Sequence, residues 1–176
     1  MIKYAFVLVL SLFAQISWAD TVGNWNNLSN LLAVGLPAVA GGYSLYEDDK
    51  QGVLELGLSL GSTFAATEAL KYQFPETRPD NSGNDSFPSG HTAIAFAAAR
   101  YLDKRYSDEN YGVYLYGAAA LTGIARVEAD KHHWSDVLVG GALGFGMSEL
   151  FTSNRNTQLV VLPYKDGIFA SWTQKW

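Results

Sequence analysis

The sequence predicts an all-α protein, a compact helix bundle of five to six helices followed by a short C-terminal β-hairpin. Apolar segments of helical length alternate with polar connections through residues 31–152. Hydrophobic residues make up 48% of the chain and charged residues 16%, which supplies a core and excludes a disordered protein. Near the C-terminus, extended patterns at Leu159–Tyr164 and Ile168–Trp172 flank Lys165-Asp166-Gly167, as in a hairpin with a glycine-containing turn.

The first 19 residues have the pattern of a secretory signal peptide. Lys3 precedes a mostly apolar segment, Tyr4–Ile16, which is too short to span a bilayer comfortably. Ser17-Trp18-Ala19 then forms a small-x-small cleavage site before Asp20. We expect a mature chain of residues 20–176 that forms a single domain in the periplasm. The alternative is an uncleaved segment that anchors the protein in the inner membrane.

The first half of the mature chain predicts two helices and one long loop. Thr21–Asn30 is polar and rich in asparagine, so we expect an irregular entry. Leu31–Tyr46 predicts a helix that Pro37 kinks or ends early. Gln51–Tyr72 predicts a second, largely buried helix. Gln73–Phe87 is a polar loop of unusual length for a compact domain, and such loops are often functional.

The second half predicts three more helices, at Gly90–Arg105, Tyr111–Arg126 and Ser135–Phe151. The last one contains glycines that we attribute to close contact between helices: Gly140, Gly141, Gly144 and Gly146. A membrane span needs about 20 apolar residues. Because charged residues interrupt or bound each of these segments, none is a convincing span by itself. We expect a soluble periplasmic bundle, with peripheral contact to a membrane surface as the alternative.

Composition excludes several classes of function. The chain contains no cysteine, which removes disulfides, thiolate catalysis and cysteine-ligated metals. Its net charge is -5, so there is no basic surface of the kind that binds nucleic acid. The expected partner is a phosphorylated substrate, for the following reasons.

Three cations are placed where they could hold a phosphate group. Lys71 and Arg78 flank the start of the long loop, and Arg126 ends the fourth predicted helix. The planar fork of arginine suits the oxygens of a phosphate. Pro88-Ser89-Gly90-His91 begins a helix, where unpaired N–H groups and the helix dipole favour an anion. Taken alone, Ser89 could equally be a plain N-cap.

Two histidines and one carboxylate complete a hydrolytic site. A neutral histidine can attack phosphorus and form a phosphohistidine, which water then cleaves. His132 and Asp136 lie four residues apart at a helix start, so the carboxylate could orient the ring. His91 could protonate the leaving oxygen. Spacing alone does not choose between His132 and its neighbour His133.

Other polar residues have simpler interpretations. Glu128 and Asp130 are expected on a solvated loop, and Glu55 and Glu68 could be partnered core carboxylates. A metal site could be assembled from the three histidines and Asp130. The chain lacks His-Glu-x-x-His or a similar ligand spacing, so we predict no metal and no cofactor.

Together, these blocks resemble the type 2 phosphatidic acid phosphatase superfamily. That superfamily includes bacterial acid phosphatases, lipid phosphate phosphatases, polyprenyl diphosphate phosphatases and vanadium haloperoxidases. Its pattern Lys-x6-Arg-Pro, Pro-Ser-Gly-His and Ser-Arg-x5-His-x3-Asp is present over residues 71–136. One position departs from the pattern, because Ala125 stands where the family usually has serine.

The resemblance implies a role for each matching residue. His132 would be the nucleophile, in preference to His133, with Asp136 as its orienting partner and His91 as the general acid. The remaining matches would hold the phosphate: Lys71, Arg78, Ser89, Gly90 and Arg126. No metal is implied for hydrolysis. The C-terminal hairpin lies outside the pattern.

The leading hypothesis is a metal-independent phosphatase acting on phosphate monoesters or diphosphates, preferably lipid-linked ones such as phosphatidate or a polyprenyl diphosphate. The alternatives are a soluble non-specific acid phosphatase, a vanadate-dependent haloperoxidase that would bind vanadate at His132, and a non-catalytic module that binds anionic lipid.

Overall fold

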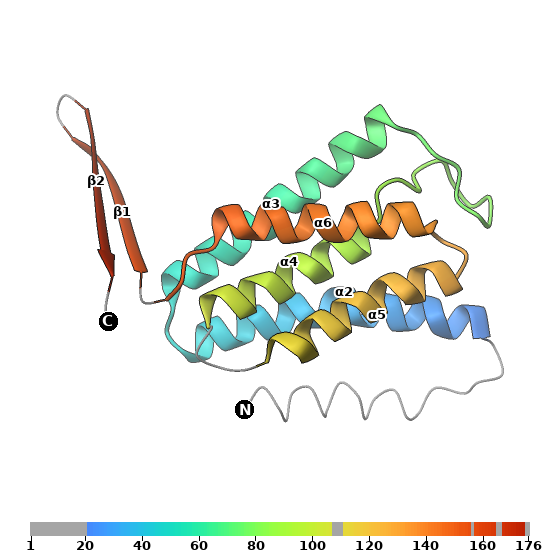
Figure 1. Ribbon diagram of the computed structural model, residues 1–176, viewed down its shortest axis with the longest axis horizontal. Helices are drawn as coiled ribbons and strands as arrows, with labels where there is room; N and C mark the ends of the chain where they lie inside the picture. Colours follow the sequence, from blue (N-terminus) through green and yellow to red (C-terminus); the bar gives the residue numbers. More distant parts are fainter. Residues whose placement is uncertain (1–20, 107–110, 156, 165–166, 175–176) are drawn as a thin grey trace.

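The structure is a computed structural model that describes residues 21–106, 111–155, 157–164 and 167–174, the last two ranges as backbone only. The signal-peptide prediction concerns residues outside these ranges. Five helices make up the described bundle: α2 (Thr21–Tyr46), α3 (Lys50–Gln73), α4 (Gly90–Arg105), α5 (Gly112–Glu128) and α6 (Trp134–Phe151). This confirms the all-α prediction (Figure 1).

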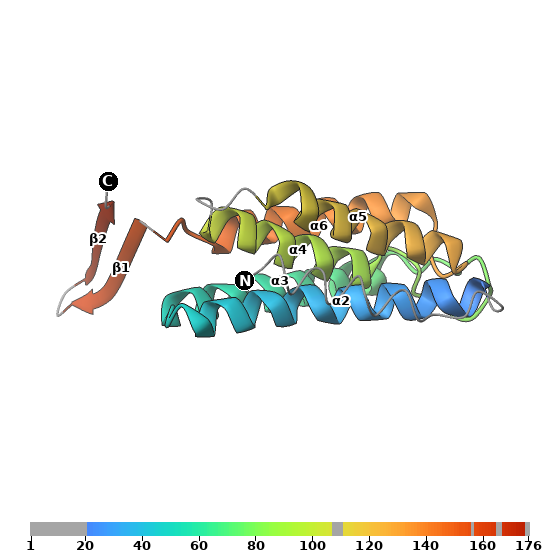
Figure 2. The same ribbon diagram turned by 90° about the horizontal axis from the view of Figure 1, so that it is seen from below.

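Helix α4 is the centre of the bundle and packs against all four other helices. In the side view, α2 and α3 lie on one side of α4, and α5 and α6 lie on the other (Figure 2). Alanines make α4 slim enough for this position, since Ala93, Ala95 and Ala97–Ala99 are fully buried. The two chain segments that carry His91 and His132 therefore meet at one end of the bundle.

Two glycines of α6 allow it to approach α4 closely. A Cβ at Gly140 would lie 2.5 Å from the carbonyl oxygen of Ser89, and one at Gly144 would lie 1.9 Å from that of Ala93. The predicted close helix contact is thus found at these positions. Gly146 differs, because a Cβ there would meet nothing within 4 Å.

The prediction for residues 21–30 was wrong. Thr21–Asn30 is the first part of α2, and the helix continues through Pro37 to Tyr46 without an early end. Asparagine has low helix propensity, but tertiary contacts outweigh propensity when a helix has a buried face. Here Leu28, Leu32 and Leu36 are buried, and several of the amides have partners described below.

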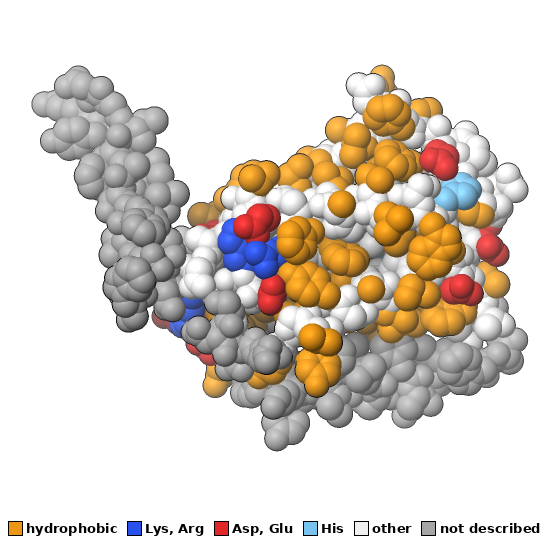
Figure 3. All heavy atoms as spheres, viewed as in Figure 1, with side chains coloured by type: hydrophobic (Ala, Val, Ile, Leu, Met, Phe, Trp, Pro, Cys, Tyr) orange, Lys and Arg blue, Asp and Glu red, His pale blue; other side chains and the backbone are white. Residues whose placement is uncertain are grey.

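The faces of α3 and α6 are inverted relative to those of a typical helix on a water-soluble protein. The buried side of α3 includes Glu55, Ser59 and Thr63, whereas Leu54 and Phe64 are 63% and 61% exposed. Helix α6 likewise buries mainly glycine, Ser148 and Asp136 and exposes large apolar side chains. Figure 3 shows apolar side chains across the middle of one face of the molecule, with charged groups toward its two ends.

The end of the bundle opposite the histidines contains a buried ion-pair cluster. Arg105, 3% exposed, contacts Asp49 at 2.7 Å and Glu55 at 3.3 Å. Glu55 is thus a partnered buried carboxylate, whereas Glu68 is exposed and lines the pocket described below.

After α6, strands β1 (Thr157–Tyr164) and β2 (Gly167–Gln174) pair antiparallel, with Leu159 opposite Trp172. The predicted hairpin is therefore present at its expected position.

Candidate active site

One pocket of about 340 Å³ brings most of the predicted site residues together at the end of the bundle. The lining residues are Ala33, Phe64, Thr67, Glu68, Lys71, Arg78, Gly90, His91, Ile94 and His132. The other three predicted residues, Ser89, Arg126 and Asp136, are buried behind this surface. All eight predicted residues therefore belong to one region, although they come from α3, α4, α5, α6 and two loops.

Two loops form the polar end of the pocket, and several bonds fasten them to one another. In the 74–89 loop, Arg78 N donates to Gly83 O at 2.9 Å, and Asn81 adopts a left-handed φ of 58° that asparagine tolerates. Asp80 N donates to the carbonyl oxygen of Asp130 at 3.1 Å, and the Asp80 carboxylate pairs with Lys131. The Lys131 ammonium lowers the pKa of Asp80, which keeps this ion pair charged. Arg78 and His132 are held at a fixed separation as a result.

His132 is buried, and its ring orientation follows from one hydrogen bond. Its Nδ1 lies 2.7 Å from the carbonyl oxygen of Ser86. Because a carbonyl oxygen can only accept, Nδ1 carries the proton and Nε2 is left with a free lone pair. Burial, followed by the charges of Arg126 and Lys71, lowers the pKa of His132 to about 3. The ring is therefore neutral at physiological pH, as a nucleophile requires.

Asp136 differs from the expected orienting partner of His132. Its Oδ2 is 3.6 Å from His132 Nδ1, which is too long for a hydrogen bond but close enough for an electrostatic interaction. The same oxygen accepts from Ser86 Oγ at 2.6 Å and from His133 N at 2.8 Å. Ser86 thus orients the ring directly, and Asp136 supplies negative charge and holds Ser86.

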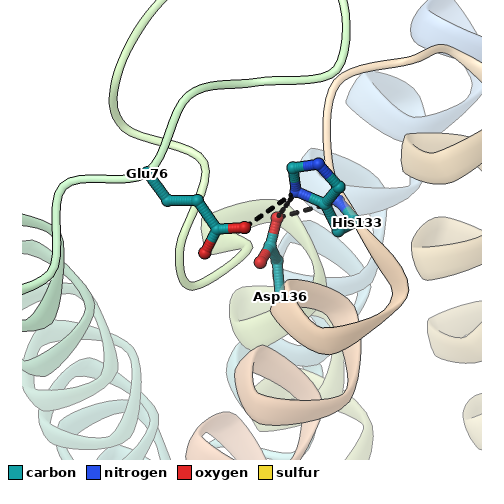
Figure 4. A group of neighbouring side chains, drawn as sticks. All are labelled: Glu76, His133 and Asp136. Atoms are coloured by element: carbon teal, nitrogen blue, oxygen red, sulfur yellow. Dashed lines mark hydrogen bonds and ion pairs between the residues drawn. The ribbon is translucent and has the colours of Figure 1, made fainter.

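His133 lies outside the pocket lining and connects two carboxylates. Its Nδ1 is 3.0 Å from Glu76 Oε1 and 3.4 Å from Asp136 Oδ2 (Figure 4). These three residues offer ligand atoms within 4.8 Å of one another, so a cation could be considered there. Since the Asp136 oxygen already accepts two hydrogen bonds, the geometry favours a bridge that joins the 74–89 loop to the start of α6.

The three predicted cations have different surroundings. Arg78 makes a two-pronged ion pair with Asp85, with both N–O distances 2.8 Å, and the guanidinium lowers the pKa of the Asp85 carboxyl. Lys71 Nζ donates to the carbonyl oxygen of Asp85. Arg126 is 3% exposed, and its Nε is a buried donor without a partner among the described residues. An unpaired buried donor is costly, and a phosphate oxygen would provide the missing acceptor.

Ser89 and Gly90 form the start of α4, as expected. Ser89 Oγ lies 2.9 Å from Thr92 Oγ1, and no capping bond is formed by its side chain. Ser89 N donates to the backbone oxygen of Asp136 at 3.0 Å, which joins the start of α4 to that of α6. The Ser89 hydroxyl therefore lies at the start of α4, where a helix dipole and unpaired N–H groups would favour an anion.

Sequence analysis missed several residues that contact the site, among them Ser86, Asp85, Asn26 and Asn30. Asn26 Oδ1 accepts from Arg126 Nη1 at 2.8 Å, and Asn30 Oδ1 is 2.8 Å from His91 Nε2. Glu128 and Asp130 are exposed, as predicted, but Glu128 is the last residue of α5 and not part of a loop. A signal for Ser86 and Asp85 could have been their position inside a long polar loop, whereas the asparagines had no distinguishing spacing.

The chain is similar to a known protein family over the region that contains His91, Arg126 and His132. A family model described as the PAP2 superfamily matches residues 80–159. A lipid A 1-phosphatase from Porphyromonas gingivalis is 44% identical over 84 residues, which are 47% of this chain and 19% of that protein. Lipid phosphate phosphatase 1 from Arabidopsis thaliana is 36% identical over 75 residues, covering 35% of this chain and 23% of that protein. These two matches therefore span about a fifth of the relatives' own length.

Other similarities extend over most of the chain. The Aquifex aeolicus LpxE structure has 26% identity and a TM-score of 0.57, and covers 80% of this chain and 92% of that one. The fold is shared by a transmembrane PAP2 type phosphatidylglycerolphosphate phosphatase from Bacillus subtilis. That structure has 24% identity and a TM-score of 0.61, and the match covers 85% of this chain and 84% of that one. A lipid A 1-phosphatase from Helicobacter pylori is 31% identical over 138 residues, which are 73% of this chain and 68% of that protein. With the motif residues gathered in one pocket and a relative matched over two thirds of its length, the chain belongs to the PAP2 superfamily.

Proposed function

We propose that this protein is a metal-independent phosphatase that hydrolyses a lipid-linked phosphate monoester or diphosphate through a phosphohistidine on His132. The observation that carries the proposal is the state of His132: a neutral ring with its proton fixed on Nδ1, in a pocket that also holds Lys71 and Arg78. Phosphoryl transfer to a side chain requires a nucleophile, fixed positive charge near the phosphate oxygens, and a proton donor for the leaving group.

In the first step, the lone pair of His132 Nε2 forms a bond to phosphorus while the bond from phosphorus to the leaving oxygen breaks. His91 donates a proton to that oxygen. In the free site, burial and the charges of Arg126, Arg78 and Lys71 lower the pKa of His91 to about 4, so its ring is neutral there. The negative charge of a bound phosphate raises this pKa, and the ring takes up a second proton from solvent before the transfer. Lys71, Arg78 and Arg126 counter the charge on the other phosphate oxygens.

In the second step, water attacks the phosphohistidine. His91, now neutral, accepts a proton from the water, the bond between nitrogen and phosphorus breaks, and the electron pair returns to His132 Nε2. Inorganic phosphate leaves, and both histidines regain their initial states. Asp136 stabilises the cationic ring of the intermediate from 3.6 Å away.

The walls of the pocket support a lipid-linked substrate. Ala33, Phe64 and Ile94 provide an apolar side next to the charged end. Proteins of this family that resemble the chain are called lipid A 1-phosphatase and lipid phosphate phosphatase. These names add a phosphorylated glycolipid to the phosphatidate and polyprenyl diphosphate suggested by the sequence.

The inverted faces of α3 and α6 support a location in the membrane, with the pocket at one membrane surface. Exposed leucine and phenylalanine side chains are stable against lipid, and small or polar residues are suited to contacts between membrane helices. Among the described helices, α2 has the length and hydropathy to cross a bilayer, a property that core helices can share. The periplasmic orientation and the cleavage after Ala19 stay predictions.

The test uses the full chain in detergent with EDTA present. Phosphate release is measured from p-nitrophenyl phosphate, phosphatidate, a polyprenyl diphosphate and lipid A. We expect a lipid substrate to be preferred, His132→Ala to abolish turnover, and an acid-labile phosphoenzyme to accumulate in a rapid quench. His133→Ala is the matched control and should retain turnover, because His133 lies outside the pocket lining. Activity in His132→Ala, or loss of activity with EDTA, would overturn the proposal.

A further inference from the structure

Helix α2 lies outside the motif blocks and outside the matched residues 80–159, yet its side chains reach the centre of the site. Asn26, Asn30 and Ala33 are spaced by four and three residues, so they share one helical face. Asn26 contacts Arg126, Asn30 contacts His91, and Ala33 lines the pocket. This face of α2 therefore forms one side of the active site.

The contact between Asn30 and His91 has a definite chemical consequence. Asn30 Oδ1 lies 2.8 Å from His91 Nε2, and an amide oxygen can only accept. Nε2 therefore carries a proton in the free site. Because this proton is donated to Asn30, the proton delivered to the leaving oxygen must be carried by the other ring nitrogen, Nδ1. The amide fixes both the rotation of the ring and the place of its proton.

We propose that Asn30 is a positioning residue for the general acid His91. The inference rests on the proposed function. When bound phosphate favours the doubly protonated ring, the Nδ1 proton passes to the leaving oxygen, while Asn30 holds Nε2–H and limits the ring to one orientation. An unrestrained ring would spend part of its time in orientations that cannot donate, and a small misplacement of a reacting group lowers the rate.

A purely structural role for Asn30 predicts different behaviour. Asn30 is exposed, whereas the packing of α2 comes from Leu28, Leu32 and Leu36 on its buried face. Removing the Asn30 amide should therefore leave the fold and its thermal stability nearly unchanged. The effect we expect is instead specific to reactions whose leaving group needs a proton.

The experiment compares two substrates with different leaving groups. Hexyl phosphate leaves as a poor alkoxide that needs a proton, whereas p-nitrophenolate leaves without one. We expect Asn30→Ala to lower kcat/KM about 10-fold or more for hexyl phosphate and less than about 3-fold for p-nitrophenyl phosphate. His91→Ala should show the same difference between the two substrates, with a larger loss for hexyl phosphate. Asn30→Asp keeps an acceptor and adds negative charge beside His91, so activity should persist and the alkaline limb of the pH profile should shift upward.

Asn27→Ala is the matched control, because Asn27 is an exposed α2 residue away from the face shared with Ala33, and it should behave as the parent protein. Equal losses on both substrates in Asn30→Ala, or no loss, would overturn the positioning role. If the parent protein cleaves neither substrate nor any lipid phosphate, or if His132→Ala stays active, the proposed function itself fails, whatever Asn30 does.

Discussion

Replacing Asp136 with asparagine removes one negative charge from the site with little change in shape. The asparagine side-chain oxygen can still accept from Ser86 Oγ and from His133 N, which now bond to Asp136 Oδ2 at 2.6 and 2.8 Å. His132 keeps its bond to the Ser86 carbonyl oxygen. The substitution therefore isolates the electrostatic contribution of the carboxylate from the orientation of the ring.

The magnitude follows from the 3.6 Å between Asp136 Oδ2 and His132 Nδ1. When phosphorus bonds to Nε2, the ring becomes cationic because Nδ1 retains its proton. At an effective dielectric constant of roughly 20, one full charge at this distance gains about 5 kcal/mol. About half of that charge in the transition state gives about 2–3 kcal/mol, or roughly a 100-fold loss of kcat for Asp136→Asn.

The assay is single-turnover phosphate release with rapid quench, so that formation of the phosphoenzyme is measured separately from its hydrolysis. Ser86→Ala is the matched variant, because it removes one donor to the Asp136 carboxylate but keeps the charge and the carbonyl oxygen at position 86. We expect it to lose less than about 10-fold, since one hydrogen bond contributes about 1 kcal/mol. A folded Asp136→Asn protein within about 3-fold of the parent rate would refute the electrostatic role.

Three further predictions concern pH, buried charge and packing. The pKa of His132 is lowered to about 3, so its neutral form persists as the pH falls. NMR of the free protein should therefore show no His132 titration between about pH 4 and 8. A titration midpoint near 6.5 would contradict this prediction. Arg105→Met leaves two buried carboxylates unpaired and should lower the unfolding free energy by about 3–5 kcal/mol in a denaturant titration; an unchanged midpoint would contradict the ion-pair account. Gly144→Ala should lower the unfolding free energy by about 1–3 kcal/mol, because the new methyl group meets the carbonyl oxygen of Ala93. Gly146→Ala places its methyl group in open space and should raise the unfolding free energy by up to about 1 kcal/mol. Equal effects of the two substitutions would refute the close contact at Gly144.

The helices α3 to α6 were predictable because their ends have local signals. Pro88 and Ser89 mark the start of α4, and the polar residues 107–110 separate it from α5. The start of α2 lacked such a signal. Its asparagines disfavour a helix locally, and the groups that bind them, Arg126 and His91, lie 100 and 61 residues away from Asn26 and Asn30. Only the contacts made in the assembled bundle explain why these asparagines lie in a helix.

The site shows a similar division between what patterns predict and what folding adds. Spacing and family resemblance pointed to Lys71, Arg78, His91 and His132, and the structure brings all four to one pocket. The atom that orients His132 is a backbone oxygen at Ser86. Every residue has such an oxygen, so no side-chain pattern identifies it. Sequence spacing therefore predicted that Asp136 orients His132, whereas the backbone oxygen of Ser86 accepts the hydrogen bond that does so.

The inverted helix faces also bear on why hydropathy gave little indication of the proposed membrane location. A helix that contacts lipid on one side and a phosphate site on the other carries polar residues among its apolar ones, and these lower its mean hydropathy. Helix α3 shows this over its length: Leu54 and Leu58 are 63% and 48% exposed, whereas Ser59 and Thr63 are buried. In the proposed membrane placement, an acyl chain beside Phe64 and a phosphate beside Lys71 would be about 10 Å apart along the helix axis, since each residue adds about 1.5 Å. That separation fits a lipid phosphate that enters with its tail in the bilayer and its headgroup at the histidines, and it makes α3 the element on which the choice between a lipid and a soluble substrate depends.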